Sequence, residues 1–304
     1  MTGSGPVVVL AGGTGGAKLA RGMLDVAGDE LVVVANTGDD VEAHGGHVSP
    51  DPDLVTYWLA DRIDERGWGL AGDTFAVMDG LRELGVDVWF NLGDRDLAVC
   101  LHRAERLALG ARLTECLVEL ATAFGVPARV LPMTDDRVRT RVCARGEWRS
   151  LQEFLIRDRG AGPVEDVALE GVEDAEPTPE VVEALASARA VVIGPSNPVI
   201  SIGPILAVPG VRDALRTAPA PVVAVSPLVR GEVLKGPTAA FLEWAGLTLD
   251  ADGIATTYDG VIDGLVADQR ADRVPVLETD VLMADAAGRR RVAEAALGFA
   301  EALR

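Results

Sequence analysis

The sequence has 304 residues, of which 47 are acidic and 28 basic, and its formal net charge is −19. This length predicts one large or two small domains with a sizeable core, and so negative a charge argues against a nucleic-acid partner. No apolar run approaches the roughly 20 residues of a membrane helix and no secretory signal is visible, so we expect a cytoplasmic protein without a membrane partner.

The chain opens with two buried strands joined by a helix. Val7–Ala11 is a short β-branched run typical of a buried parallel strand. A glycine-rich segment follows it, then an amphipathic helix at Ala17–Ala27 and a second apolar strand at Leu31–Asn36. This order predicts a doubly wound, mostly parallel Rossmann-like α/β sheet.

The remaining elements continue this pattern with one interruption. Helices are predicted at Leu54–Ile63, Thr74–Leu84, Asp96–Leu107, Leu113–Phe124 and Val208–Leu215, at 236–247 and at Asp285–Leu303, and strands at Asp87–Leu92, 128–133, 189–193, 220–225, Gly264–Ala267 and Val274–Leu277. Charged and apolar residues alternate within residues 134–175, which predicts an antiparallel hairpin in a small inserted α+β subdomain. We otherwise expect a single α/β domain over residues 1–304.

The segment Leu10–Gly22 is rich in glycine and lies between the first strand and its helix. Such a turn aims backbone N–H groups and the positive helix end at an anion, so phosphate binding is predicted for Gly12, Gly13, Thr14, Gly15, Gly16 and Lys18. The alternative is a tight turn without a ligand. Lys18 precedes a leucine, unlike the lysine of a P-loop, and it replaces the third glycine of a dinucleotide fingerprint, whose acidic residue is here Asn36.

An acidic segment, Asn36–Leu54, follows the second strand and contains two histidines, His44 and His47. Carboxylates beside a phosphate site need a cation between them, and Mg²⁺ is the usual one. We therefore predict Asp39, Asp40 and Asp53 as metal ligands. The alternative is a solvated acidic loop in which Asp53 is a helix N-cap. The histidines lack helical i, i+4 spacing and a nearby cysteine, which argues against zinc.

Three further loops carry groups suited to phosphates. Arg95 either pairs with a phosphate or forms a salt bridge to its acidic neighbours Asp94 or Asp96. Hydroxyl and N–H groups of Gly194–Leu206 suit a nucleotide, the alternative being a long turn with a serine N-cap; the candidates are Ser196, Asn197, Ser201 and Gly203. A third loop brings Arg230 and Lys235. No Ser–His–Asp or Cys–His arrangement is visible, and phosphoryl-group transfer needs none, because alignment and a metal suffice.

Taken together, these motifs resemble one family, the 2-phospho-L-lactate transferases of deazaflavin biosynthesis. The resemblance runs in order over nearly the whole chain and rests on "GGTGGAKLARG", "NTGDD", "SPDPD", "LGDRD", "LPMTDD", "GPSNPVISIGPIL" and "AVSPLVRGEVLKGP". It implies a Mg²⁺-dependent homodimeric enzyme. Such an enzyme transfers a phospho-three-carbon acid from a guanosine-diphospho-linked donor to the deazaflavin Fo, releases GMP and forms the first phosphodiester precursor of coenzyme F-420.

The resemblance also implies roles for individual residues. Asp53 matches an aspartate near Fo and the metal, Asp39 and Asp40 match the family's acidic loop, and one of the three is expected to help deprotonate the Fo hydroxyl. The glycine loop, Asn36 and the "GPSNP" loop match nucleotide-binding positions. Fo contacts are further expected at Arg95 and at Asn91, which replaces a residue that is often basic in the family.

Two other classes of function share the opening pattern. One is a NAD(P)-dependent oxidoreductase, against which Asn36 and the missing third glycine argue. The other is a non-enzymatic regulator that binds nucleotide sugars, against which the full set of acidic motifs argues. The sequence leaves open whether the transferred acid is phospholactate, phosphoenolpyruvate or phosphoglycerate, because one small group in a pocket discriminates by only about 1–3 kcal/mol.

Overall fold

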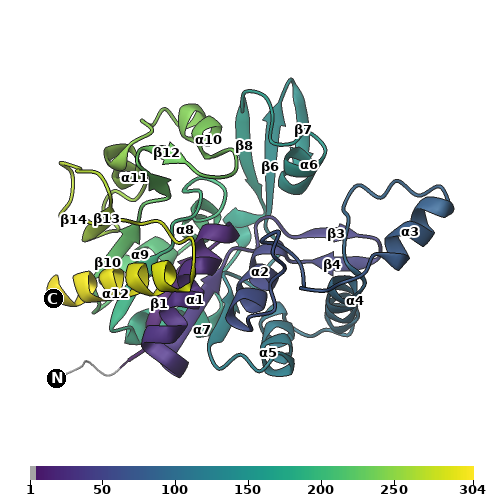
Figure 1. The fold of residues 1–304 in the computed structure, drawn as a ribbon, viewed down its shortest axis with the longest axis horizontal. Coiled ribbons are helices and arrows are strands. Elements are labelled where there is room, and N and C mark those ends of the chain that lie inside the picture. Colours follow the sequence, from purple (N-terminus) through teal and green to yellow (C-terminus); the bar gives the residue numbers. More distant parts are fainter. Residues whose placement is uncertain (1–4) are drawn as a thin grey trace.

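A seven-stranded parallel sheet forms the centre of the computed structural model, which describes residues 5–304 (Figure 1). The strand order is β14-β13-β10-β9-β1-β2-β5. The strands are β1 (Val7–Ala11), β2 (Leu31–Ala35), β5 (Arg129–Pro132), β9 (Ala190–Ile193), β10 (Val222–Val225), β13 (Gly264–Ala267) and β14 (Val276–Glu278). The chain runs outward from β1 through β2 to β5, then returns to β9 and runs outward on the other side. This is the predicted doubly wound sheet, with its switch point between β1 and β9.

Helices cover both faces of this sheet. One face carries α1 (Gly13–Ala27), α2 (Pro50–Leu59), α5 (Leu113–Ala123) and α12 (Ala286–Ala302). The other carries α7 (Pro179–Ser187), α8 (Gly203–Ala207), α9 (Val211–Thr217), α10 (Thr238–Trp244) and α11 (Ala251–Thr257). Short 3-10 turns lie at Gly28–Glu30 and Val172–Asp174. No helix among the residues described is long and apolar enough to cross a membrane.

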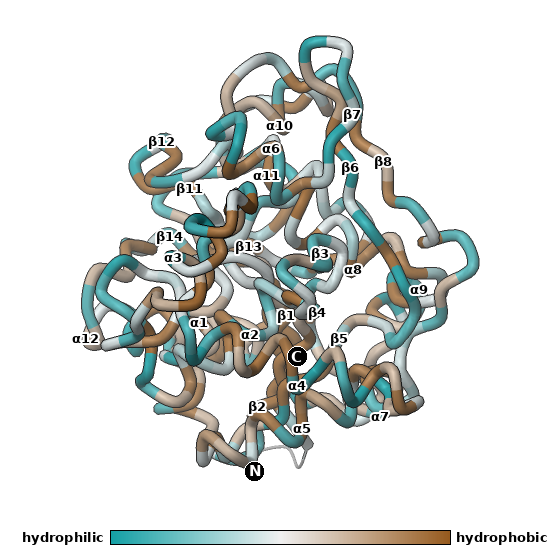
Figure 2. The backbone as a smooth tube through the Cα atoms, turned by 90° about the vertical axis from the view of Figure 1, so that its right-hand side faces the viewer, coloured by the Kyte–Doolittle hydropathy of each residue, from teal (hydrophilic) through white to brown (hydrophobic). Residues whose placement is uncertain are grey.

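The apolar runs of the sequence explain these two layers. Every residue of β1, β2, β9, β10 and β13 is buried, because alternate side chains of each strand enter opposite cores. In β1, Val8 and Leu10 pack on the α7–α9 side, and Val7 and Val9 pack on the α1–α12 side. Figure 2 shows hydrophobic segments along the central strands, whereas the outer loops are largely hydrophilic.

A separate antiparallel sheet follows β5 and rises above the main sheet in Figure 1. It comprises β6 (Arg139–Ala144), β7 (Glu147–Ser150) and β8 (Asp166–Glu170), in the order β7-β6-β8, with α6 (Leu151–Ile156) beside it. The predicted hairpin is the β6–β7 pair. Val142 and Phe154 pack against Phe241 of the main body. That residues 134–175 form a subdomain of their own stays a prediction.

A small lobe extends beyond β2, toward the right in Figure 1. It contains the hairpin β3 (Val41–Ala43) and β4 (Gly46–Val48), with α3 (Ala76–Glu83) and α4 (Asp94–Ala108). The predicted strand at Asp87–Leu92 is wrong. Leu92 is buried in the lobe's own small core, Val88, Trp89 and Phe90 lie half-buried against it, and the stretch pairs with no strand among the described residues.

The two lobe helices cap each other, which accounts for much of the "LGDRD" motif. The Asp73 carboxylate accepts hydrogen bonds from the first N–H groups of α4, at 2.9 and 3.0 Å, and Asp94 accepts from those of α3, at 3.0 and 2.9 Å. A Cβ at Gly93 would collide with the Asp73 carboxylate. This motif therefore begins a helix of the lobe and does not follow a strand of the main sheet. A small hairpin after β10, β11 (Leu228–Val229) with β12 (Glu232–Val233), completes the fold.

Candidate active site

The glycine loop after β1 meets the "GPSNP" loop after β9 at the switch point. A Cβ at Gly15 would collide with the carbonyl oxygen of Pro195, and a Cβ at Gly16 would lie 2.7 Å from the Ser196 hydroxyl oxygen. Gly12 is similarly close to Ser201, whose Cβ would be 2.7 Å away. Glycine is therefore required at these three positions because other parts of the chain approach them too closely for a side chain.

We expect Gly15→Ala to destabilise the protein by about 1–3 kcal/mol, because the added methyl group must push two backbone segments apart. Gly28→Ala is not a suitable control, since Gly28 has a positive φ of 60°. Gly298→Ala is better matched, because Gly298 has open space around its Cβ position. Chemical denaturation of both variants tests the prediction, and equal stability of Gly15→Ala and Gly298→Ala would contradict it.

A carboxylate of the chain occupies the anion position at the start of α1. The Gly13 N–H donates to Asp51 Oδ1 at 2.5 Å, and the Asn36 side-chain amide donates to Asp51 Oδ2 at 2.9 Å. Burial raises the pKa of Asp51 to about 6 despite these hydrogen bonds. Asp51 stands in the acidic segment, but its position in the sequence gave no reason to place it against Gly13.

The acidic segment is not a solvated loop, because Asp39, Asp40, Asp51 and Asp53 are all buried. Its two histidines have structural partners. His44 has a positive φ of 51° in the β3–β4 turn, and its Nε2 lies 2.8 Å from the Phe90 carbonyl oxygen. His47 Nε2 lies 3.0 Å from Asp40 Oδ2, while the Ser49 hydroxyl donates to Asp40 Oδ1 at 2.8 Å. Ser49, and not Asp53, is the N-cap residue of α2.

Asp39 links the acidic segment to the inserted sheet. Its oxygens accept from the Asn36 amide at 3.2 Å and from Gln152 Nε2, on α6, at 2.9 Å. Burial raises the pKa of Asp39 well above its ordinary value, and the charges of Asp51 and Asp40 raise it further. Asp39, Asp40 and Asp51 thus lie in one buried region, and none of them offsets the negative charge of the others.

Asp53 has a cationic partner, Arg103 of α4. The guanidinium contacts both carboxylate oxygens, with Arg103 Nη1 3.1 Å from Asp53 Oδ2, and it also donates to the His47 carbonyl at 2.9 Å. Both side chains are almost fully buried. Burial lowers the pKa of Arg103, but the charge of Asp53 more than offsets this, so Arg103 remains a cation. Sequence reasoning did not find Arg103.

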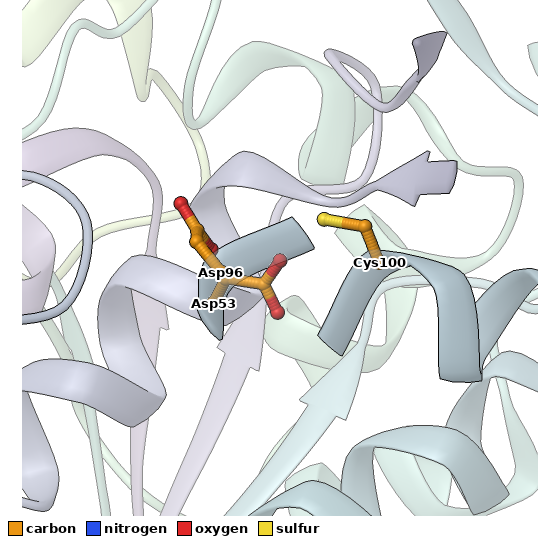
Figure 3. A group of neighbouring side chains, drawn as sticks. All are labelled: Asp53, Asp96 and Cys100. Atoms are coloured by element: carbon orange, nitrogen blue, oxygen red, sulfur yellow. The ribbon is translucent and has the colours of Figure 1, made fainter. Parts of the chain in front are cut away.

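Asp53, Asp96 and Cys100 lie together in Figure 3, with single ligand atoms within 4.8 Å of one another. Arg103 already neutralises Asp53, and the Tyr57 hydroxyl donates to Asp96 at 2.7 Å. Burial raises the pKa of the Cys100 thiol, so that it stays protonated. The chemistry of this group therefore fits a hydrogen-bonded network around Arg103 better than a metal site.

Asp96 should make stability depend on pH. Burial, and then the charge of Asp53, raises its pKa from 3.8 to about 6, so the folded protein binds this proton more tightly than the unfolded chain does. Its contribution to stability is full below about pH 4 and is lost as the pH rises through 6, a change of about 3 kcal/mol. Asp96→Asn should lack this loss. Urea unfolding at intervals from pH 4 to pH 7 tests it, and parallel profiles for the two proteins would contradict it.

The predicted Fo contacts lie in the lobe and point to other partners. Arg95 is exposed and donates to the Ala71 carbonyl at 3.2 Å, and no ion pair to Asp94 or Asp96 is present among the residues described. Asn91 accepts a hydrogen bond from Arg82 at 2.5 Å. Neither contact tests a role in Fo binding, which stays a prediction for both residues.

The "GPSNP" loop is organised by its own side chains. Asn197 Oδ1 accepts from the N–H groups of Val199 and Ile200 at 2.9 and 3.2 Å. Gly203 begins α8 after Ile202, so the alternative of a serine N-cap there is wrong. Three buried hydroxyl groups around these loops have no hydrogen-bond partner within the described chain: those of Ser196, Thr37 and Thr140. Ser196 was predicted, whereas the two threonines were not.

Lys18 does not reach the acids in this structure. It is half-buried on α1, with its Nζ 5.9 Å from the centre of the Trp58 ring on α2. The structure thus brings together the glycine loop, Asn36, the acids and the "GPSNP" loop, whereas the side chains of Lys18, Arg95 and Asn91 interact with Trp58, Ala71 and Arg82.

A doubly wound parallel sheet with a glycine-rich loop at its switch point defines a Rossmann-like α/β protein. Residues 7–292 match the family described as 2-phospho-L-lactate transferase CofD, and the chain belongs to that family. It is therefore an enzyme of a transferase family.

Individual relatives agree with this assignment. The chain is 39% identical over 317 residues to a phosphoenolpyruvate transferase of Kitasatospora aureofaciens, covering 98% of each protein. It is 38% identical over 266 residues to a 2-phospho-L-lactate transferase of Methanosarcina mazei, covering 87% of each. Among solved structures, a UPF0052-family protein of Bacillus halodurans matches 90% of this chain and 88% of its own, with a TM-score of 0.57 and 17% identity, which shows the shared fold.

Proposed function

We propose that this enzyme transfers the phospho-three-carbon-acid part of a guanosine-diphospho-linked donor to the side-chain hydroxyl of Fo, with release of GMP. The product is the first phosphodiester precursor of coenzyme F-420. Family membership supports this proposal, as do relatives named for transfer of phospholactate and of phosphoenolpyruvate.

The observation that carries the proposal is the group of buried acids beside the glycine loop. Asp39, Asp40 and Asp51 form no ion pair with any lysine or arginine of residues 5–304. Hard carboxylate oxygens without a protein cation are a donor set that fits Mg²⁺. These three residues would hold the ion. Asp53 was also predicted as a ligand, and that role stays a prediction, because its carboxylate is paired with Arg103. When bound, Mg²⁺ neutralises charge and polarises a phosphoryl oxygen.

The chain's own groups supply the rest of the chemistry. The unpartnered hydroxyls of Ser196, Thr37 and Thr140 are free to donate to donor phosphates. The Fo hydroxyl oxygen attacks the phosphorus that adjoins the three-carbon acid. The bond from this phosphorus to the bridging oxygen breaks, and GMP leaves with that oxygen. The proton passes to one of the carboxylates of Asp39, Asp40 and Asp53, whichever is not engaged by the ion.

Mass spectrometry of reactions with Fo, Mg²⁺ and each of three donors tests this function. The donors carry phospholactate, phosphoenolpyruvate or phosphoglycerate linked to GMP. We expect a phosphodiester product from one of them, lost when a chelator is added. Folded protein that gives no product with any donor would refute the proposal and favour a nucleotide-sugar-binding regulator. A cytoplasmic homodimer is part of the same proposal, and sedimentation of the pure protein tests the dimer.

A further inference from the structure

A cavity of about 400 Å³ lies against α4 and α5, and its volume is within the range of pockets that bind small molecules. Its lining combines apolar and basic side chains, chiefly Leu70, Leu120, Phe124, Arg62, Arg95 and Arg103. Phe124 ends α5 just before β5, so this wall lies toward the amino end of that strand. Of the described residues that line the cavity, none belongs to the glycine loop, the acidic segment or the "GPSNP" loop. The cavity is therefore separate from the candidate active site.

Arg103 gives this cavity a buried hydrogen-bond donor without a partner. Its Nη atoms contact Asp53 and donate to the His47 carbonyl, but its Nε has no acceptor within residues 5–304. The side chain is only 2% exposed, so bulk water does not replace the missing acceptor. A buried N–H of a charged group is costly to leave unpaired. An acceptor oxygen bound in the cavity would remove that cost.

Two further arginines of the lining bring positive charge that no acid offsets. Arg62 and Arg95 form no ion pair within the part of the chain that the structure describes. The Arg62 guanidinium carbon lies 4.8 Å from the centre of the Phe124 ring, and the Arg95 side chain donates to the Ala71 carbonyl. On a protein with 47 acidic residues, two unpaired arginines at one cavity indicate an anion that comes from outside the chain.

The one acid among the described lining residues, Glu119, is already engaged. It accepts hydrogen bonds from Arg106 Nε and Nη2 at 3.1 and 2.9 Å, and His102 Nε2 lies 3.0 Å from its other oxygen. It therefore does not balance the unpaired arginines. The cavity thus presents positive charge beside an apolar wall, a combination that suits a ligand with an anionic end and an apolar body.

We propose that this cavity, the α4–α5 cavity, binds a small carboxylic acid with an aromatic body. The planar carboxylate matches the fork of an arginine. It accepts from Arg103 Nε and is neutralised by Arg62 and Arg95. The body packs against Leu120 and Phe124. Inorganic phosphate would leave these apolar side chains uncovered, and a neutral aromatic molecule would leave the arginines unpaired. This binding is independent of the transfer reaction.

Titration of the full-length protein with para-trifluoromethylbenzoate, followed by fluorine NMR, tests the site. We expect a Kd of about 1 mM or below, as a compact ligand of this size reaches when it is well buried. The double variant Arg62→Gln, Arg95→Gln should raise the Kd at least about tenfold, because two charge partners are lost. The matched control is Arg270→Gln, Arg290→Gln, which removes the same total charge from exposed positions outside the cavity.

Two further measurements locate the probe. The Arg103 Nε–H signal of ¹⁵N-labelled protein should shift downfield as the probe binds, because this N–H gains an acceptor. Ala123→Trp, at an exposed position of the lining, should block binding and leave thermal stability unchanged. The uncharged analogue para-trifluoromethylbenzamide should bind at least about tenfold more weakly than the acid.

The proposal is overturned if the wild-type protein does not bind the probe, or if the two double variants bind it equally well. Inorganic phosphate that displaces the probe at equal affinity would also overturn it, because the apolar wall would then contribute nothing. Displacement by Fo would make the cavity part of the Fo site, in which Arg95 is a predicted contact, and would refute a separate site. A probe that stays bound in excess Fo supports one.

Discussion

Replacing Arg103 by methionine is expected to destabilise the protein by about 3–5 kcal/mol, because Asp53 would remain as an uncompensated charge in the interior. Both side chains are almost fully buried, and the guanidinium contacts both oxygens of the carboxylate. Urea unfolding at pH 7.5 measures the loss. Arg106→Met is the control, since Arg106 is one turn further along α4 and its ion pair with Glu119 is partly exposed.

The control should lose no more than about 1 kcal/mol, as exposed ion pairs do. The double variant Asp53→Leu, Arg103→Met should recover much of the stability, because removing both charges leaves nothing unpaired. An Arg103→Met protein as stable as Arg106→Met would show that Asp53 does not depend on Arg103.

Asp51→Asn is expected to reduce turnover at least about 100-fold, because it removes a proposed ligand of Mg²⁺. Replacing a residue that only supports a metal ligand through a hydrogen bond typically costs less. Stability without Mg²⁺ should be unchanged or higher at pH 7.5, because the buried Asp51, whose pKa is raised to about 6, carries a costly charge there. Asparagine keeps an oxygen that can accept from the Gly13 N–H.

Asp61→Asn is the matched control for this variant. Asp61 follows α2, is exposed and has a positive φ of 53°, which asparagine tolerates. Steady-state rates over a range of Mg²⁺ concentrations, together with thermal unfolding, separate the two effects. Equal loss of turnover in both variants, or turnover retained by Asp51→Asn, would remove Asp51 from the metal-binding group.

The sheet could be predicted because its strands are buried on both faces. Runs such as Val7–Ala11 and Leu31–Ala35 contain no polar residue, and only a central parallel strand accounts for that. The same reasoning failed at Asp87–Leu92. Its short apolar stretch packs half-exposed in the lobe, and periodicity alone cannot separate such a stretch from a strand.

The site was predicted as a region but not as a set of contacts. The partners of Asp51 are Gly13 and Asn36, which are distant in the chain, so no local pattern indicates them. Arg103 did leave a signal. Its spacing from Asp96 and Cys100 puts all three on one face of α4, and an arginine on a face that also carries a buried cysteine requires a buried acid.

Because lysine is scarce in this protein, its two lysine side chains can be labelled specifically. Apart from the α-amino group, its only amines are those of Lys18 and Lys235. The lowered pKa of Lys18 leaves more of its amine unprotonated and reactive near neutral pH. Reductive methylation with ¹³C-formaldehyde would therefore label two side chains, and their NMR signals would report on α1 and on the loop before α10 separately. In a protein rich in surface lysines, such labelling would first require many substitutions; here the natural sequence already isolates the two positions.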